Sequence, residues 1–80
     1  MIEYEIKQHI VTLSETGTTT KELNLVSWNG NPAKYDIRIW KQTEEGRRAS
    51  KGITLTGPEL SLLAAAIGGI QEGAEHEHEA

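Results

Sequence analysis

The sequence predicts an α+β fold in which four strands are followed by one helix. Apolar and polar residues alternate along most of residues 2–56, which is the pattern of half-buried strands. Beyond Thr56 the apolar residues recur at helical spacing instead. A chain of 80 residues has room for one domain only, which we place at residues 1–72, with an acidic tail at residues 73–80 that we expect to be disordered.

Four stretches carry the strand pattern: residues 2–13, 19–28, 33–42 and 51–56. In the first stretch, Ile and Tyr occupy one parity, and charged residues with His9 occupy the other. The turn signal between the second and third stretches is Asn29-Gly30-Asn31-Pro32, because Asn-Gly tolerates positive φ at low cost. Residues 43–50 are strongly charged, and we expect them to form a loop before the fourth strand.

The helix has a clear start signal. Thr56-Gly-Pro-Glu59 matches a capping box, with Thr56 as the cap and Glu59 at the third helical position. The helix that follows is apolar nearly all round, so we expect it to be buried on more than one side. One small sheet cannot bury such a helix, whereas a second copy of it could. We expect Gly68-Gly69 to end the helix; the alternative is that these glycines let two backbones approach closely.

Composition excludes several kinds of protein. There is no cysteine, so disulfides, thiolate zinc sites and cysteine nucleophiles are ruled out. No apolar run reaches the ~20 residues that span a bilayer, and the first residues lack the pattern of a signal peptide. We therefore expect no membrane partner and a cytoplasmic location, on the nucleoid if the protein is bacterial. A domain this small, with 36% apolar residues, buries little surface by itself, which favours a partner subunit.

Charge is unevenly distributed along the chain, whose formal net charge is −4. Residues 21–52 contain seven Lys and Arg against four Asp and Glu, a balance of +3. Residues 71–80 contain four Glu and neither Lys nor Arg, a balance of −4. A basic body with an acidic end is one charge pattern of nucleic-acid-binding proteins.

Alternation in the third strand separates two kinds of side chain. Tyr35, Ile37 and Ile39 share the parity that we expect to pack against the helix. Because one helix covers one face of a sheet, the opposite parity should face solvent or a ligand. That parity holds Lys34, Asp36, Arg38 and Trp40.

Cations beside exposed aromatic rings suit single-stranded nucleic acid, because unpaired bases stack on the rings while Lys and Arg hold the phosphates. Trp28 of the second strand would join this open face if Leu23 and Leu25 point inward, but the reverse parity of that strand is equally open. Structural alternatives also stay open at this point. Both tryptophans fit core or dimer-interface positions, the cations of the third strand fit a solvated face, and residues 47–51 fit a soluble loop.

Two motifs resemble a known family. Lys34–Trp40 reads KYDIRIW and Lys51–Thr56 reads KGITLT, and a Pro-Glu-Leu helix start follows them. Over residues 19–67, this order is similar to the positive cofactor four family of transcriptional coactivators, most of all to its short bacterial members, the YdbC-type single-stranded DNA-binding proteins. The resemblance implies a homodimer of curved four-stranded antiparallel sheets (β-β-β-β-α). It also implies helices at the dimer interface and channels for single-stranded DNA on the sheets.

Several residues match positions that bind DNA in the family. The resemblance implies this role for Lys21, Trp28, Arg38, Trp40 and Lys51. Together with the other cations of the third strand and the charged stretch after it, the predicted nucleic-acid-binding residues are Lys21, Trp28, Lys34, Arg38, Trp40, Arg47, Arg48 and Lys51. The predicted dimer interface on the helix comprises Leu60, Leu63, Ala64 and Ile67.

We therefore expect a non-enzymatic homodimer that binds single-stranded DNA in transcription, replication or repair, with RNA as an alternative ligand. The sequence predicts no catalytic residue, no cofactor, no small-molecule substrate and no metal site. His76 and His78 lie in an EHEHE run in which no ordered metal site is expected. The alternative function is a dimeric protein-interaction module whose open sheet binds a peptide or a partner protein.

Overall fold

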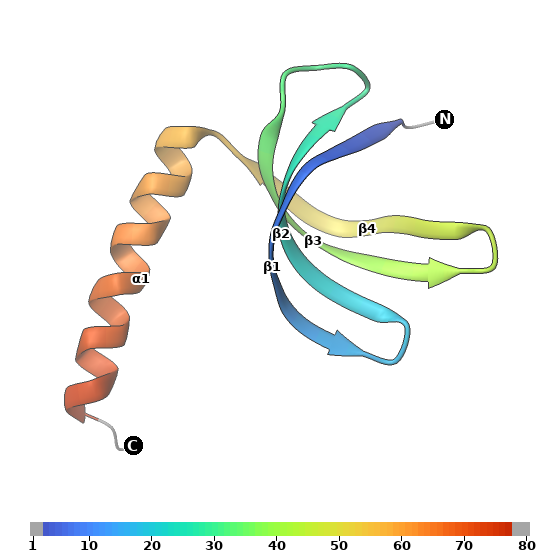
Figure 1. Ribbon diagram of the computed structural model, residues 1–80. Coiled ribbons are helices and arrows are strands. Elements are labelled where there is room, and N and C mark those ends of the chain that lie inside the picture. Colours follow the sequence, from blue (N-terminus) through green and yellow to red (C-terminus); the bar gives the residue numbers. More distant parts are fainter. Residues whose placement is uncertain (1–2, 78–80) are drawn as a thin grey trace.

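The computed structural model describes residues 3–77, with side chains for residues 3–70. Four strands are followed by one helix, which confirms the predicted order of elements (Figure 1). The elements are β1 (Tyr4–Thr16), β2 (Thr19–Trp28), β3 (Lys34–Thr43), β4 (Gly46–Leu55) and α1 (Gly57–Glu77).

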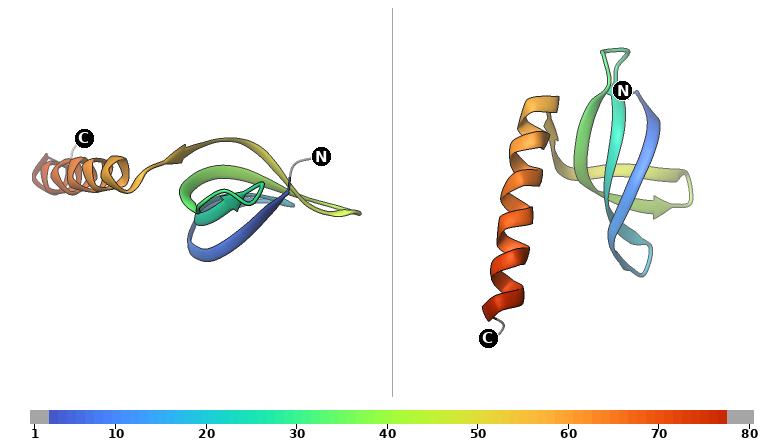
Figure 2. Two further views of the ribbon diagram at one scale, coloured as in Figure 1. Left: turned by 90° about the horizontal axis from the view of Figure 1, so that it is seen from above. Right: turned by 60° about the vertical axis from the view of Figure 1, so that its left-hand side comes forward.

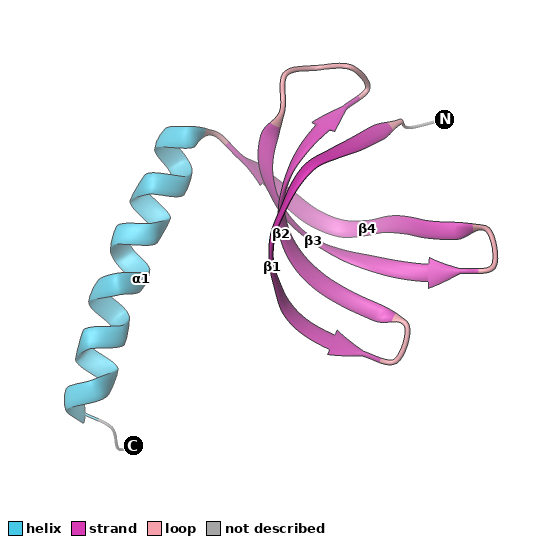
Figure 3. Ribbon diagram, viewed as in Figure 1, coloured by secondary structure: helices cyan, strands magenta, loops and turns pink. Residues whose placement is uncertain are grey.

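The strands form one antiparallel sheet in the order β1-β2-β3-β4, so each strand pairs with its neighbours in the chain. The sheet is strongly curved, as Figure 3 shows. Register shifts interrupt the β1–β2 pairing at three places, between Ile6 and Gln8, between His9 and Val11, and between Thr12 and Ser14. An extra residue in one strand bends and twists that strand. The shifts in β1 therefore contribute to the curvature.

The turn between β2 and β3 has the predicted Asn-Gly geometry. Asn29 and Gly30 adopt positive φ angles of 53° and 77°. The amide of Asn31 donates to the carbonyl of Trp28 at 2.9 Å, which closes the turn. Two consecutive residues with positive φ match the twist of the flanking strands, so this turn fixes their register.

The charged stretch at residues 43–50 is not the loop that we predicted. β3 continues to Thr43 and β4 begins at Gly46, which leaves Glu44 and Glu45 as the turn. Gly46 has a φ of 115°, and its carbonyl accepts a 2.7 Å hydrogen bond from the Thr43 hydroxyl. Glycine supplies this backbone conformation at low cost, so the hairpin closes early. Arg47 therefore lies in β4 and not in a loop.

Side chains divide between an inner face, inside the curve of the sheet, and an outer face. Buried residues of the inner face are Glu22, Asn24, Val26, Asp36 and Trp40. The outer face carries the aliphatic residues Leu23, Leu25, Ile37, Ile39 and Ile53. We expected this aliphatic side to pack against the helix. Instead its residues are half-buried or exposed, and Ile53 is 56% exposed.

The helix α1 begins as predicted. The amide of Thr56 donates to Glu59 Oε1 at 2.9 Å, and the amide of Glu59 donates to Thr56 Oγ1 at 3.2 Å, which confirms the capping box. Figure 2 shows α1 beside the sheet and not across either face. Only Thr56 separates β4 from α1, and the helix leaves the aliphatic side uncovered.

The end of α1 differs from the prediction. Gly68-Gly69 does not end the helix, which runs to Glu77 and so includes residues 73–77 of the expected disordered tail. Residues 78–80 lie outside the described part of the chain. A glycine inside a helix costs only about 1 kcal/mol, and the Leu and Ala residues before it favour helix.

The predicted interface residues of α1 are partly covered within one chain. Leu60 and Leu63 are half-buried, whereas Ala64 and Ile67 are exposed. Two more apolar residues of α1, Leu62 and Ile70, are also exposed. The expected burial of the helix on more than one side is therefore not reached inside a single chain.

Candidate nucleic-acid interface

A groove on the inner face gathers aromatic and basic side chains. Its larger part has a volume of about 800 Å³ and is lined by Tyr4, Trp28, Asn29, Arg38, Arg47, Arg48, Ala49 and Ser50. A second part, of about 540 Å³, lies at the β2–β3 turn and adds Lys34. The two parts share Trp28 and Arg38, so we describe them together as the main groove.

Three aromatic rings pack together on the inner face. The ring of Tyr4 lies 5.6 Å from that of Trp28 and 5.1 Å from that of Trp40, measured between centroids. The two indoles are nearly parallel, with centroids 6.3 Å apart and an angle of 7° between their planes. Trp40 is only 1% exposed, whereas Tyr4 is 38% exposed. Tyr4 and Trp28 therefore line the groove, and the buried ring of Trp40 packs against both of them.

A buried carboxylate holds Arg38 against Trp28. Asp36 is fully buried and accepts hydrogen bonds from Arg38 Nε at 2.9 Å and from Arg38 Nη2 at 2.7 Å. The indole nitrogen of Trp28 donates to the same carboxylate at 3.2 Å. The guanidinium of Arg38 then lies 4.6 Å from the centroid of the Trp28 ring. Since a buried charge requires a partner, this contact fixes the orientation of both groove residues.

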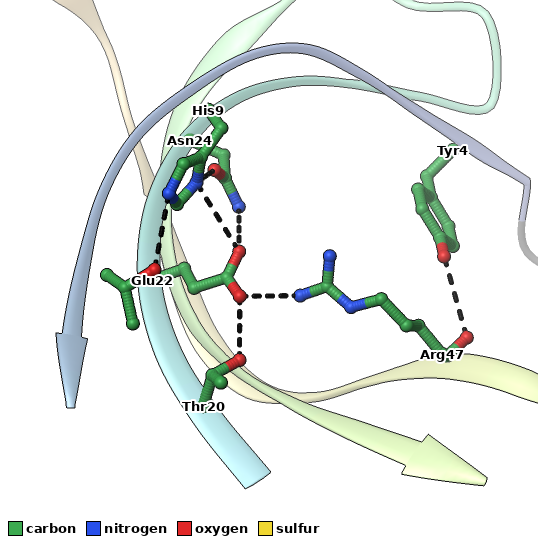
Figure 4. A network of polar contacts seen from close by, with 7 residues as sticks. Tyr4, His9, Thr20, Glu22, Asn24 and Arg47 are labelled. Atoms are coloured by element: carbon green, nitrogen blue, oxygen red, sulfur yellow. Dashed lines mark hydrogen bonds and ion pairs between the residues drawn. The ribbon is translucent and has the colours of Figure 1, made fainter. Parts of the chain in front are cut away.

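A second carboxylate, that of Glu22, binds Arg47 (Figure 4). Glu22 Oε2 accepts from Arg47 Nη2 at 2.8 Å and from the Thr20 hydroxyl at 2.7 Å. Glu22 Oε1 accepts from Asn24 Nδ2 at 3.1 Å. The guanidinium of Arg47 lies 4.8 Å from the centroid of the Trp40 ring. This cover, together with the packing of Tyr4, explains why Trp40 is buried.

The pKa of Glu22 reflects two opposing effects. Burial of the carboxyl raises its pKa, because the charged form loses hydration. Hydrogen bonds from Thr20, Asn24 and Arg47 and the positive charge of Arg47 lower it, and together they prevail, so the pKa lies below its ordinary value. Glu22 is therefore ionised at neutral pH and maintains its ion pair with Arg47.

Comparison with known proteins identifies the family. A family model described as Transcriptional Coactivator p15 (PC4) matches residues 15–66, which cover all of β2, β3 and β4 and the start of α1. The chain belongs to the PC4 family. A protein of Treponema pallidum (strain Nichols), described as uncharacterized, is 43% identical over 61 residues, which are 75% of this chain and 69% of that protein. The resemblance found in the sequence is thus confirmed.

Most of the predicted PC4-type residues meet at the main groove. Trp28, Lys34, Arg38, Arg47 and Arg48 line it. The predicted parity of β3 is confirmed, since Asp36, Arg38 and Trp40 share the inner face. Trp40 nevertheless does not present an open ring, because Arg47 and Tyr4 cover it.

Two predicted residues lie elsewhere in the structure. Lys21 and Lys51 line a shallow hollow of about 280 Å³ together with Ile37, Ile39 and Ile53 of the outer face. Lys21 shares the parity of Leu23 in a strand whose pairing with β3 has no register shift, which places it on the outer face. The roles of Lys21 and Lys51 in binding remain predictions.

One residue of the PC4-type groove is absent from the predicted site. Alternation predicts Tyr4 as an apolar strand residue, whereas the structure pairs it with Trp28 in the β1–β2 register and places it in the lining of the groove. Its position depends on where the register shifts of β1 fall, which alternation does not reveal. His9 is exposed and does not line the groove, and its Nδ1 lies 2.7 Å from Asn24 Oδ1 and 3.6 Å from Glu22 Oε1.

The helix, in the part of the chain that the structure describes, is not long and apolar enough to cross a membrane. Among the described residues, no group of three or more His, Cys, Asp or Glu could hold a metal ion. His76 and His78 lie outside the residues whose side chains are described.

Proposed function

We propose that the protein binds single-stranded DNA in the main groove, tolerates many sequences, and acts as a homodimer in transcription, replication or repair in the cytoplasm. The observation that carries this proposal is the meeting of the exposed Tyr4 ring and the half-buried Trp28 ring with four cations in one groove. Each stacked base contributes about 1–3 kcal/mol when judged by alanine substitution. A duplex hides the faces of its bases, so the groove favours single strands.

The cations of the groove fall into two classes. Arg38 and Arg47 are paired with buried carboxylates and keep Trp28 and Trp40 in place. Lys34 and Arg48 have no carboxylate within ion-pair distance among the described residues, and both are exposed. We assign the phosphate contacts to Lys34 and Arg48. A single strand that makes two phosphate contacts gives a slope of about −1.4 for log K against log salt, at about −0.7 per contact.

The surfaces that one chain leaves uncovered support the proposed homodimer. The aliphatic outer face and the apolar residues of α1 are half-buried or exposed in the isolated chain. Exposed apolar surface of this kind marks an interaction site. A second copy of α1 and of the outer face has the same apolar character, and we assign both surfaces to the dimer contact.

A direct test measures the anisotropy of labelled oligothymidine and of a matched duplex during titration with the protein at several salt concentrations. We expect tighter binding to the single strand and a negative salt slope. Lys34→Gln and Arg48→Gln should each weaken binding and reduce the slope by about 0.7. Lys41→Gln is the matched control, because Lys41 is an exposed lysine of β3 that does not line the main groove. Equal loss in all three variants, or no binding at low salt, would contradict the proposal.

The rival function, binding of a peptide or a partner protein, is favoured by one observation. Pairing with Asp36 and Glu22 neutralises two of the four groove cations, which leaves a surface of low net charge. A mixed-charge peptide groove gives little salt slope, so the same titration separates the two functions. An RNA competitor in that titration tests the choice between DNA and RNA, because RNA differs by its 2′-hydroxyls.

A further inference from the structure

We propose that a separate cavity beside the main groove is a further subsite for one nucleotide of the strand, and that Arg47, held by Glu22, covers the Trp40 ring of this cavity in the free protein. The inference rests on the proposed function, since the nucleotide belongs to the strand held in the main groove. The cavity has a volume of about 300 Å³ and lies near the β1–β2 turn. That volume is at the lower end of the range for small-ligand sites, about 300–1,000 Å³.

Arg47 is the connection between the two sites. Its side chain lines both the main groove and the cavity. A strand that passes Arg47 along the inner face therefore leaves one site and enters the other.

The lining of the cavity suits a nucleotide. Trp40 provides an aromatic ring, and its indole N–H is buried without a hydrogen-bond partner. Leaving a buried donor unpaired costs about 1–3 kcal/mol, so a carbonyl of a base could relieve that cost. Thr18, Thr20 and Gln42 add hydroxyl and amide groups that can reach the edge of a base. The Trp40 ring and the hydrogen-bonding groups beside it therefore suit a base, and the Arg47 guanidinium suits a phosphate.

The contact between Arg47 and Glu22 acts as a latch on this site. Arg47 covers the Trp40 ring, and its side chain is 36% exposed on a long, flexible stem. Glu22 is buried and also accepts hydrogen bonds from Thr20 and Asn24, so Arg47 is not its sole donor. A phosphate can take the place of the carboxylate, because Arg binds both groups with the same fork of donors. The exchange uncovers Trp40 at the moment when a nucleotide arrives.

One test uses the free protein and needs no DNA. Trp28→Phe leaves Trp40 as the single tryptophan, so acrylamide quenching then reports its accessibility. Adding Glu22→Gln should at least double the quenching constant, because the neutral amide holds Arg47 weakly. Glu15→Gln is the matched control, since Glu15 lines the same cavity and has no ion pair with Arg47 among the described contacts. Equal quenching in the two variants would overturn the latch.

A second test uses strand length. Thr18→Phe should fill the cavity, whereas Thr16→Phe changes an exposed residue that does not line it. Affinity for oligothymidines of increasing length should rise to the same plateau in wild type and Thr16→Phe. In Thr18→Phe the last increase of affinity with strand length should be absent. The affinity for long strands should then be about tenfold lower, the contribution of one stacked base. Glu22→Gln should tighten binding of the long strands several-fold more than Glu15→Gln does.

The outcomes separate the two proposals. If wild type binds single strands but Thr18→Phe and Thr16→Phe agree at every length, the subsite is overturned and the main groove stands. If wild type binds no single strand at any salt concentration, the proposed function fails and the subsite fails with it.

Discussion

The inner and outer faces of the sheet reverse the usual relation between polarity and burial. The inner face buries Glu22, Asn24 and Asp36, all polar or charged. The outer face exposes or half-exposes its aliphatic residues, such as Ile53. An antiparallel sheet with one solvated face ordinarily shows the opposite arrangement. The difference indicates that the inner face is organised to hold side chains in fixed positions, whereas the outer face is suited to an apolar partner.

Curvature is the physical origin of this reversal. Bending brings the inner side chains of all four strands together, so they cover one another, while the outer side chains spread apart. Buried charges are tolerated on the inner face because each is paired, Asp36 with Arg38 and Glu22 with Arg47. The four predictions below test this contrast, beginning with the largest expected effect.

Removing the inner carboxylate at Asp36 should have the largest effect. Asp36→Ala leaves the largely buried Arg38 and the Trp28 indole without their acceptor, and losing one partner of a buried pair costs about 3–5 kcal/mol. Urea unfolding at one fixed protein concentration measures this change. Glu44→Ala, at the exposed β3–β4 turn, is the control. A loss below 1 kcal/mol for Asp36→Ala would show that the pair does not organise the inner face.

Close packing of β4 against β3 should be the next most sensitive feature. A Cβ at Gly52 would clash with the Cβ of Arg38 and with the carbonyl oxygen of Ile37. Gly52→Ala should therefore destabilise the fold by about 1–3 kcal/mol, as overpacking does. Gly57→Ala is the matched control, because a Cβ there meets no atom within 4 Å. Equal stability of the two variants would mean that β4 can shift away at no cost.

A substitution on the outer face should weaken formation of the homodimer and leave the folding of each chain unchanged. Ile53→Asn should raise the dissociation constant of the homodimer at least tenfold, because it places an amide in the apolar contact. Leu13→Asn is a control of matched exposure, since Leu13 is 54% exposed and Ile53 is 56% exposed. Sedimentation at several concentrations gives both constants. If both substitutions weaken assembly equally, the outer face has no special role in it.

The smallest expected effect is a dependence of stability on pH. Because folding lowers the pKa of Glu22, this carboxylate stabilises the fold above its unfolded pKa, and that contribution is lost as pH falls through the lower folded pKa. The difference in unfolding free energy between wild type and Glu22→Gln should be constant near neutral pH and shrink below about pH 4.5. A difference that grows in acid would contradict the lowered pKa.

Local signals in the sequence predicted the parts of the fold that depend on neighbouring residues. Thr56 and Glu59 bond as the capping box requires, and the turn at Asn29 has the expected positive φ angles. Alternation in β3 placed Arg38 and Trp40 on one face correctly. Each of these features is settled within a few residues, so sequence spacing is sufficient to recognise it.

Features that depend on distant residues could not be read in the same way. The burial of Trp40 results from Arg47 and Tyr4, which come from two other strands. The charges at residues 43–50 predict a loop, whereas β4 begins at Gly46, whose positive φ closes the turn. The exposure of the aliphatic face depends on the direction in which α1 leaves the sheet, which no residue pattern encodes.

The register shifts of β1 have a consequence for how the protein behaves when concentrated. β1 is an edge strand, because it pairs with β2 alone in the sheet order. An uninterrupted edge offers a row of unpaired amides and carbonyls to which another chain can add a strand, and this is how sheets aggregate. Three interruptions along one strand break that row into short pieces. The same irregularities that bend the sheet thus oppose the growth of fibrils from this edge.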